Sequence, residues 1–383
     1  MKKVLVFLFL LLSGLQVFAF DWKPQSNEAL RSDMFRFVEQ FRDNTSDRSL
    51  SSSLDDFLKE QQSKADAEPY QWIYDTHAFV DQMLEKYPAE ISDGGECSLE
   101  RRNLLLLRDY PMHADNKPAD APQGLKDAYV NSVKALYAAA ESDALAWLKE
   151  GGRSRRLEVF KVYNMGYLFR SSGKVVAVDV QWSGPTEQMK EFASMIDIFF
   201  VTHPHGDHYT KALLEEVLKA GKPVILPCDL VPEYTGAEKV VISEDRMDRM
   251  NCGKISFISR MGNQGAKVPC NVYLISLGRW NIAHNGDNAV HDVEDFLGEN
   301  RVDVLVAACW NGIKKTMNHI KSNPSGTECI YFSAHENEWK HTVDHREAYE
   351  ELFRREDRLG DAGYDYLPTV ITDAAGDVIT LKK

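Results

Sequence analysis

The stretch His203-Pro204-His205-Gly206-Asp207-His208 decides how this sequence is interpreted. It follows the apolar run at residues 196–201, which is typical of a buried strand. Three of the chain's 11 histidines and one carboxylate fall within it. Neutral imidazole and ionised carboxylate are the usual ligands of zinc and its first-row neighbours. The stretch therefore predicts a metal site in the loop after a strand.

The spacing within this loop bears on the number of metals. In an extended loop, residues two apart point the same way, so His203 and His205 are placed to share one metal. Gly206 allows a turn, after which Asp207 and His208 project toward a second position nearby. The spacing favours two adjacent metals over one.

The first 19 residues have the pattern of a signal peptide. Lys2 and Lys3 form a short positive end, residues 4–12 are an unbroken apolar run, and Val17-Phe18-Ala19 is a small-x-small cleavage site. A membrane anchor needs about 20 apolar residues, and this run is far shorter. We expect residues 1–19 to be removed, leaving an exported protein, periplasmic or secreted, with no stable membrane anchor.

Net charge, cysteine content and missing motifs argue against several other classes of protein. The net charge of −13 argues against nucleic acid as a partner, because phosphate binding calls for clustered Lys and Arg. Six scattered cysteines without a CxxC pair are typical of buried thiols, with one or two disulfides open after export. No Gly-x-Ser-x-Gly elbow, phosphate loop or dinucleotide-binding glycine pattern is present. A small molecule is the expected partner.

The two halves of the chain differ in predicted secondary structure. Residues 20–155 have helical periodicity and form a predicted helical accessory region, packed on the rest because no long flexible linker holds it apart. Residues 156–383 alternate many short strands with a few helices, among them residues 292–297 and 344–358. This order indicates an α/β domain of two sheets with helices on their outer faces.

The HxHxDH stretch after an apolar strand resembles the signature of the metallo-β-lactamase fold superfamily. The resemblance covers residues 157 to the C-terminus and includes the opening strands near Val162 and Asp179. It implies a four-layer αββα sandwich, preceded here by the helical region. It also implies a metal-dependent hydrolase, closer to the lactonase and phosphodiesterase-like branches than to true β-lactamases. The implied cofactor is zinc, as one or two ions, or another divalent metal.

The resemblance implies two further ligands. A bridging aspartate is expected in a Gly-Asp at a strand end, where Asp287 fits. A last histidine is expected at the end of a late strand, where His335 follows residues 330–334. With Asp207 and His208, these residues complete the second metal position and leave room for water, as in a catalytic zinc site.

One implied ligand is missing from the first position, which His203 and His205 begin. From Tyr209 to Ala283 the sequence contains no histidine. Asn263 lies about where that ligand belongs and is the expected replacement, while Cys252 or Cys270 as a thiolate is an alternative. An amide oxygen is a weak zinc ligand, so a single ion, or one tight and one weak ion, stays open beside a binuclear centre.

Three other histidines are candidate substrate contacts. His284 lies just before the Gly-Asp and either lines the cleft, supports a ligand or packs at the rim. His341 and His345 lie four apart near His335, where they either contact substrate, form another metal site or begin an exposed helix.

Two functions follow from these residues. The first is hydrolysis of an ester, lactone or phosphodiester by a metal-activated water, with Asp207 as the catalytic residue that orients the water and moves its proton. The second is a degenerate member of the fold that binds a ligand or partner without catalysis, an alternative motivated by the missing histidine.

Overall fold

The computed structural model describes residues 26–64, 69–93, 98–109, 123–234, 240–242, 246–264, 268–289, 297, 299–308, 329–334, 368–370 and 374–382. The predicted signal peptide at residues 1–19 lies outside these ranges. Within them, no helix is both long enough and apolar enough to cross a membrane.

The first part of the described chain is helical and has its own core. Side-chain caps begin two of its helices, with Ser26 accepting from the Ala29 N–H and Asp47 accepting from the N–H groups of Ser49 and Leu50. Apolar residues at helical spacing, such as Met34 and Val38 at 0% exposure, face inward. The helices are α2 (Asn27–Asn44), α3 (Arg48–Ser63), α4 (Gln71–Leu84), α5 (Leu99–Asp109) and α6 (Gln123–Glu150).

The second part contains a 7-stranded sheet in the order β15-β2-β3-β4-β5-β6-β7. Strands β2, β3 and β4 form antiparallel pairs, and β4 to β7 run parallel to one another. Ser172 and Gly173, both at positive φ, make the tight turn between β3 and β4. The strands are β2 (Leu157–Tyr163), β3 (Gly166–Ser171), β4 (Lys174–Val178), β5 (Ile198–Phe200), β6 (Val224–Leu226), β7 (Val240–Ile242) and β15 (Val378–Leu381).

An 8-stranded sheet faces it, in the order β1-β14-β13-β12-β11-β10-β9-β8. Strands β8 to β11 pair in an antiparallel manner, and β11 to β14 run parallel. The strands are β1 (Ser92–Asp93), β8 (Arg246–Cys252), β9 (Ile255–Gln264), β10 (Val268–Leu277), β11 (Trp280–His284), β12 (Val304–Ala308), β13 (Ile330–Ala334) and β14 (Pro368–Val370).

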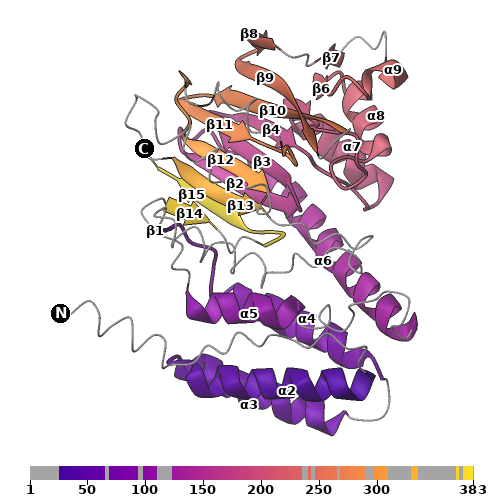
Figure 1. Cartoon of the computed structure of the whole chain (residues 1–383), viewed down its shortest axis with the longest axis vertical. Coiled ribbons are helices and arrows are strands. Elements are labelled where there is room, and N and C mark those ends of the chain that lie inside the picture. Colours follow the sequence, from indigo (N-terminus) through magenta and orange to yellow (C-terminus); the bar gives the residue numbers. More distant parts are fainter. Residues whose placement is uncertain are drawn as a thin grey trace, which may run out of the picture.

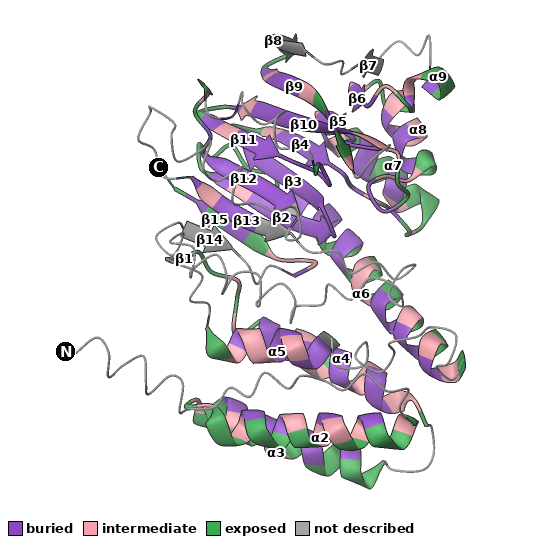
Figure 2. Ribbon diagram, in the orientation of Figure 1, coloured by how far each residue is buried: buried purple, intermediate pink, exposed green. Residues whose placement is uncertain are grey.

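The two sheets enclose a shared apolar core, and Figure 2 shows the central strands β2, β3 and β10 mostly buried. The outer face of the 7-stranded sheet is covered by the second half of α6 together with α7 (Thr186–Met195) and α8 (Lys211–Lys219). A further cluster, which includes Leu297, is buried on the outer face of the 8-stranded sheet. The helices predicted over that face at 292–297 and 344–358 lie almost entirely outside the described residues.

Three contacts tie the helical part to the sandwich (Figure 1). Helix α6 contributes Leu125 to the helical core and Trp147 to the cluster on the 7-stranded sheet. Strand β1 extends the 8-stranded sheet by pairing with β14. Arg101 of α5, 1% exposed, forms an ion pair with Asp377 beside β15. The helical part is thus packed on the sandwich, and its division from the sandwich at residues 155 and 156 stays a prediction.

The α/β class, the helical first part and the two sheets confirm the predicted fold class. The sequence pattern did not predict strands β1, β3, β8, β14 and β15. β3 contains Tyr167 and Arg170, whose polar atoms interrupt the apolar pattern although both side chains are buried. β8 has almost no apolar alternation and is held by its pairing with β9.

Candidate metal centre

The candidate centre forms where strands from both sheets end at one edge of the sandwich. β4 and β5 are parallel neighbours, so Asp179 after β4 and Thr202 after β5 lie side by side. The oxygens of Asp179 accept from the Thr202 N–H at 2.7 Å and from its hydroxyl at 2.6 Å. These bonds fix the start of the loop that contains His203 to His208.

Asp179 also orients His208. The Nδ1–H of His208 donates to Asp179 Oδ2 at 2.8 Å, which leaves Nε2 facing the interior of the cluster. Asp179 is 0% exposed and has a φ of 52°, a backbone region that non-glycine residues rarely adopt. Such strain persists where the surrounding structure over-determines it, and here three hydrogen bonds to one carboxylate do so.

Thr202 sets the tautomer of His203. Its hydroxyl hydrogen is donated to Asp179, so its oxygen accepts from His203 Nδ1–H at 3.1 Å. The lone pair of His203 is therefore on Nε2, the nitrogen that would face a metal. Both imidazoles at the centre of the cluster are thus held in the ligand orientation by a neighbouring hydrogen-bond partner.

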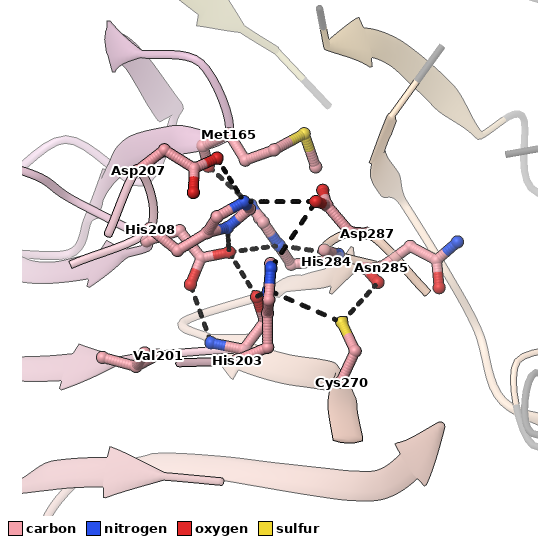
Figure 3. A network of polar contacts seen from close by, with 12 residues as sticks. Met165, Val201, His203, Asp207, His208, Cys270, His284, Asn285 and Asp287 are labelled. Atoms are coloured by element: carbon pink, nitrogen blue, oxygen red, sulfur yellow. Dashed lines mark hydrogen bonds and ion pairs between the residues drawn. The ribbon is translucent and has the colours of Figure 1, made fainter. Parts of the chain in front are cut away.

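Two overlapping groups of potential ligands converge on Asp287 (Figure 3). One contains His203, His205 and Asp287, and the other contains Asp207, His208 and Asp287. Within each group the ligand atoms all lie within 4.8 Å of one another. Asp287 Oδ2 is 3.6 Å from His203 Nε2 and 3.4 Å from His208 Nε2. The structure therefore brings together five of the six predicted ligands, with the aspartate shared between the two groups.

The centre is closed on most sides. His203 and His208 are 0% exposed, Asp287 is 1% and Asp207 is 8% exposed. His205 is the exposed member, with its ring 4.6 Å from that of His203. Among the described ligand residues, the cluster is therefore open to solvent at His205.

Burial and neighbouring charges shift the pKa values of His203, His208 and Asp207 in different directions. Burial lowers the pKa of His203, and His208 and His205 lower it further, so His203 is neutral at pH 7. Burial also lowers the pKa of His208, but Asp207, Asp287 and Asp179 outweigh it and raise that pKa well above its ordinary value. Burial raises the pKa of Asp207, yet His208 outweighs it and the net shift is downward. Asp207 is therefore ionised at neutral pH.

This donor set fits a divalent cation. His203 Nε2 is buried and has no hydrogen-bond partner among the residues that the structure describes, since Asp287 Oδ2 at 3.6 Å is too distant for one. Three buried carboxylates surround the imidazole of His208. Buried charges are stable only when paired or bound to metal, and a divalent cation balances more of this negative charge than one proton does.

The Gly-Asp turn places Asp287 as predicted at the end of β11. Gly286 has a φ of 52°, and a Cβ there would lie 2.7 Å from the Thr202 hydroxyl. Only glycine fits this close approach between the two sheets. Cys270 Sγ lies 3.9 Å from His203 Nδ1, on the ring edge away from Nε2, and burial raises its thiol pKa well above the ordinary value. Cys270 is thus a neutral core thiol, and Cys252 at the end of β8 lies outside both ligand groups.

Near the expected replacement for the missing histidine, the structure places Gln264, and not Asn263, against Asp287. Asn263 is exposed, and its backbone in β9 donates its N–H to Asn288 Oδ1 and accepts from the Ala289 N–H. The next residue, Gln264, extends its side chain to the cluster, where Nε2 donates to Asp287 Oδ2 at 2.8 Å. No feature of the sequence distinguishes Gln264 from Asn263, because the chain must fold before either meets Asp287.

His284 does not face a cleft as a substrate contact would. It is 0% exposed, its Nε2–H donates to Met165 O at 2.9 Å, and its Nδ1 accepts from the Gly286 N–H at 3.3 Å. Both nitrogens are therefore used to hold the turn that precedes Asp287. His335, His341 and His345 lie outside the described residues.

No family model and no curated protein matches the chain. Among solved structures it is similar to Igni18, a metallo hydrolase from the archaeon Ignicoccus hospitalis KIN4/I, with 13% identity and a TM-score of 0.46 over 60% of this chain and 99% of the other. It is also similar to the metallo-β-lactamase fold protein YhfI from Bacillus subtilis, with 13% identity and a TM-score of 0.42 over 59% and 100%. A third is CmlA, a diiron β-hydroxylase from Streptomyces venezuelae, with 15% identity and a TM-score of 0.41 over 61% and 55%.

The fold itself follows from features of this chain. Two sheets face each other across an apolar core, and helices α6, α7 and α8 cover one of them. The HxHxDH loop follows β5 at the edge of the sandwich, beside Asp179 and Asp287 from neighbouring strand ends. This arrangement is the two-sheet sandwich that the resemblance of the sequence to the metallo-β-lactamase fold superfamily implies.

Proposed function

We propose that this protein is a metal-dependent hydrolase that cleaves an ester, lactone or phosphodiester in a small-molecule substrate. The observation that carries the proposal is the convergence of His203, His205, Asp207 and His208 on the single carboxylate of Asp287. A divalent cation, zinc or a related metal, would be held by these two groups and would supply positive charge that acidifies water and polarises the scissile group.

The surrounding residues would each have a defined part in the reaction. Asp207 is ionised and beside His208, so its carboxylate is placed to orient the attacking water and to accept its proton. Asp179 keeps His208 in position, and burial of the cluster excludes bulk water from all sides except that of His205. Electrostatic interactions are stronger in such an enclosed site than in water.

The test measures metal content and hydrolysis in the same preparations. Purified full chain should contain at least one divalent metal per molecule after dialysis. Against a panel of esters, lactones and phosphodiesters, Asp207→Ala should abolish the activity of the wild type. Replacement of an exposed aspartate between β6 and α9 (Val231–Tyr234), Asp229→Ala, should keep it. Unchanged hydrolysis in Asp207→Ala contradicts the proposal.

The same experiment separates the alternative function. A chain that holds metal but hydrolyses nothing in the panel would match a protein that binds a ligand without turnover. An apo protein of undiminished thermal stability would point the same way, because metal bound only by the folded state must stabilise it.

We also propose that the protein is exported, on the basis of the residues 1–19 pattern. Sequencing the N-terminus of the protein recovered from the periplasm or medium tests this. The expected first residue is Phe20, and recovery only of chain that retains Met1, inside the cell, would contradict export.

A further inference from the structure

The two ligand groups that share Asp287 differ in the number of carboxylates that they contain. The group of Asp207 and His208 includes three carboxylates around one imidazole when Asp179 is counted. The group of His203 and His205 has only Asp287 as its acidic member. The sequence supplies no third histidine for it between Tyr209 and Ala283.

Gln264 contacts Asp287, a member of the group of His203 and His205, which in the described part of the chain lacks a third histidine ligand. It is the last residue of β9, and its Nε2 donates to Asp287 Oδ2 at 2.8 Å. The same carboxylate oxygen is the one that lies 3.6 Å from His203 Nε2. The amide of Gln264 and the Nε2 of His203 therefore both lie within 3.6 Å of the same oxygen of Asp287.

The side-chain carbonyl oxygen of Gln264 lacks a hydrogen-bond donor among the described residues. Its Oε1 is buried and has no hydrogen-bond partner within the described ranges, as is also true of His203 Nε2. Leaving a buried acceptor unsatisfied costs about 1–3 kcal/mol, so such atoms usually have a reason to be where they are. Both of these atoms are electron-pair donors, and a cation is the partner that satisfies both at once.

A half turn of the amide exchanges Oε1 and Nε2 without moving the rest of the side chain. In the structure, the N–H end faces the carboxylate of Asp287. With a cation beside Asp287, the oxygen end is the favourable one, because an amide oxygen is a neutral donor of the kind that manganese, magnesium and calcium accept readily and zinc accepts less well.

We propose that Gln264 takes the place of the missing histidine and acts as an oxygen ligand at the position of His203 and His205. This inference rests on the proposed function, since it assumes that the centre binds metal. It makes that position the weaker of the two for zinc and shifts its preference toward metals that favour oxygen donors. The position of Asp207 and His208 does not depend on Gln264.

The experiment compares three variants of the full chain, Gln264→His, Gln264→Ala and Asn263→Ala. Zn²⁺ and Mn²⁺ are each titrated against a chromophoric chelator, which gives the affinity of each position without reference to activity. Gln264→Ala should weaken the weaker zinc position about 10- to 100-fold and leave the tighter one unchanged. Gln264→His should strengthen the weaker zinc position by at least about 10-fold and reduce its relative affinity for manganese.

Asn263→Ala is the matched control, because its side chain is exposed and next in sequence. It should leave both affinities at the wild-type value. A second control combines Gln264→His with His205→Ala, which removes a donor from the same position. The gain in zinc affinity should disappear in this double variant, whereas it should persist when Gln264→His is combined with Asp207→Ala.

The sign of the Gln264→His effect separates a ligand from a residue that only positions Asp287. A positioning amide would be disturbed by either substitution, so weaker zinc binding in both variants overturns the proposal. Wild-type affinities in both variants overturn it as well, while metal binding itself, and with it the proposed function, stands. A wild-type chain that binds no zinc or manganese contradicts both. Should Gln264→Ala fail to fold, the gain or loss in Gln264→His decides alone.

Discussion

Two histidines buried in different parts of the molecule, His77 among the helices and His203 at the edge of the sandwich, use their ring nitrogens differently. His77 is 3% exposed, its Nε2–H donates to Arg108 O at 2.9 Å, and its Nδ1 accepts from the Ser132 hydroxyl at 2.6 Å. His203 is 0% exposed and, within the part of the chain that the structure describes, has a hydrogen-bond partner at Nδ1 but none at Nε2. Burial alone therefore does not separate a structural histidine from a candidate ligand.

The difference extends to the surroundings of the two residues. Around His77 of α4, the carbonyl of Arg108 in α5 and the hydroxyl of Ser132 in α6 bond to both ring nitrogens. Around His203, polar atoms from three strand ends point at a common volume instead. A network that closes on itself stabilises the fold, while one that leaves donors facing inward is ready for a ligand.

The largest expected effect comes from removing the carboxylate that both ligand groups share. Asp287→Ala should lose metal from both positions and lower hydrolysis by at least about a thousandfold, since the cation supplies several kcal/mol of transition-state stabilisation. Elemental analysis and initial rates measure the two losses. Asp81→Ala, which removes a carboxylate beside Arg108 in the helical core, should leave metal content unchanged. If Asp287→Ala kept both metals, the polar atoms around His203 would not form a metal site that depends on Asp287. The contrast with His77 would then be contradicted.

Metal removal should destabilise the sandwich edge and spare the helical core. Ligand binding to the folded state stabilises it by about 2.7 kcal/mol at a free concentration one hundred times Kd. Hydrogen exchange should therefore accelerate on chelation in the loop at residues 203–208 and at the end of β11, while α2 and α4 keep their rates. Equal acceleration in α2 would mean that the two parts open as one unit and would contradict a local effect.

Acid should act on the helical core through His77. Burial, with a smaller contribution from Arg108, lowers the pKa of His77 from 6.5 to about 3. The unfolded chain takes up a proton near pH 6.5 and the folded chain does not, so stability is full above that pH and falls as the pH drops toward the folded pKa. Between pH 6.5 and pH 5 the loss from this residue is about 2 kcal/mol.

Denaturant unfolding at a series of pH values measures that loss. His77→Gln removes the titrating group, so the variant should show a smaller fall in unfolding free energy over the same range. Parallel curves for wild type and His77→Gln would show that His77 is solvated or protonated in the folded state, against the closed network described here.

The sequence predicted the ligands that are adjacent in the chain better than the contacts that form only after folding. The HxHxDH loop was predictable because its ligands are adjacent in sequence and follow one apolar strand, and Asp287 because a glycine turn marks a strand end. Asp179 left a usable signal, an acidic residue in an otherwise apolar strand, yet its role depends on the parallel pairing of β4 with β5. Gln264 left none, since its contact with Asp287 exists only after β9 and β11 take their places in the sheet.

The smallest expected effect tests the hydroxyl that sets the tautomer of His203. Thr202→Val keeps the shape of the side chain but removes its bonds to Asp179 and His203, each worth about 1 kcal/mol. We expect metal affinity to fall about fivefold, because His203 is then free to place its proton on Nε2. Thr76→Val is the matched control, since Thr76 is equally buried and its hydroxyl donates to Trp72 O within α4. That variant should change the free energy of unfolding and leave metal affinity at the wild-type value. An equal change of metal affinity in both variants would show that general stability, and not the tautomer of His203, controls metal binding.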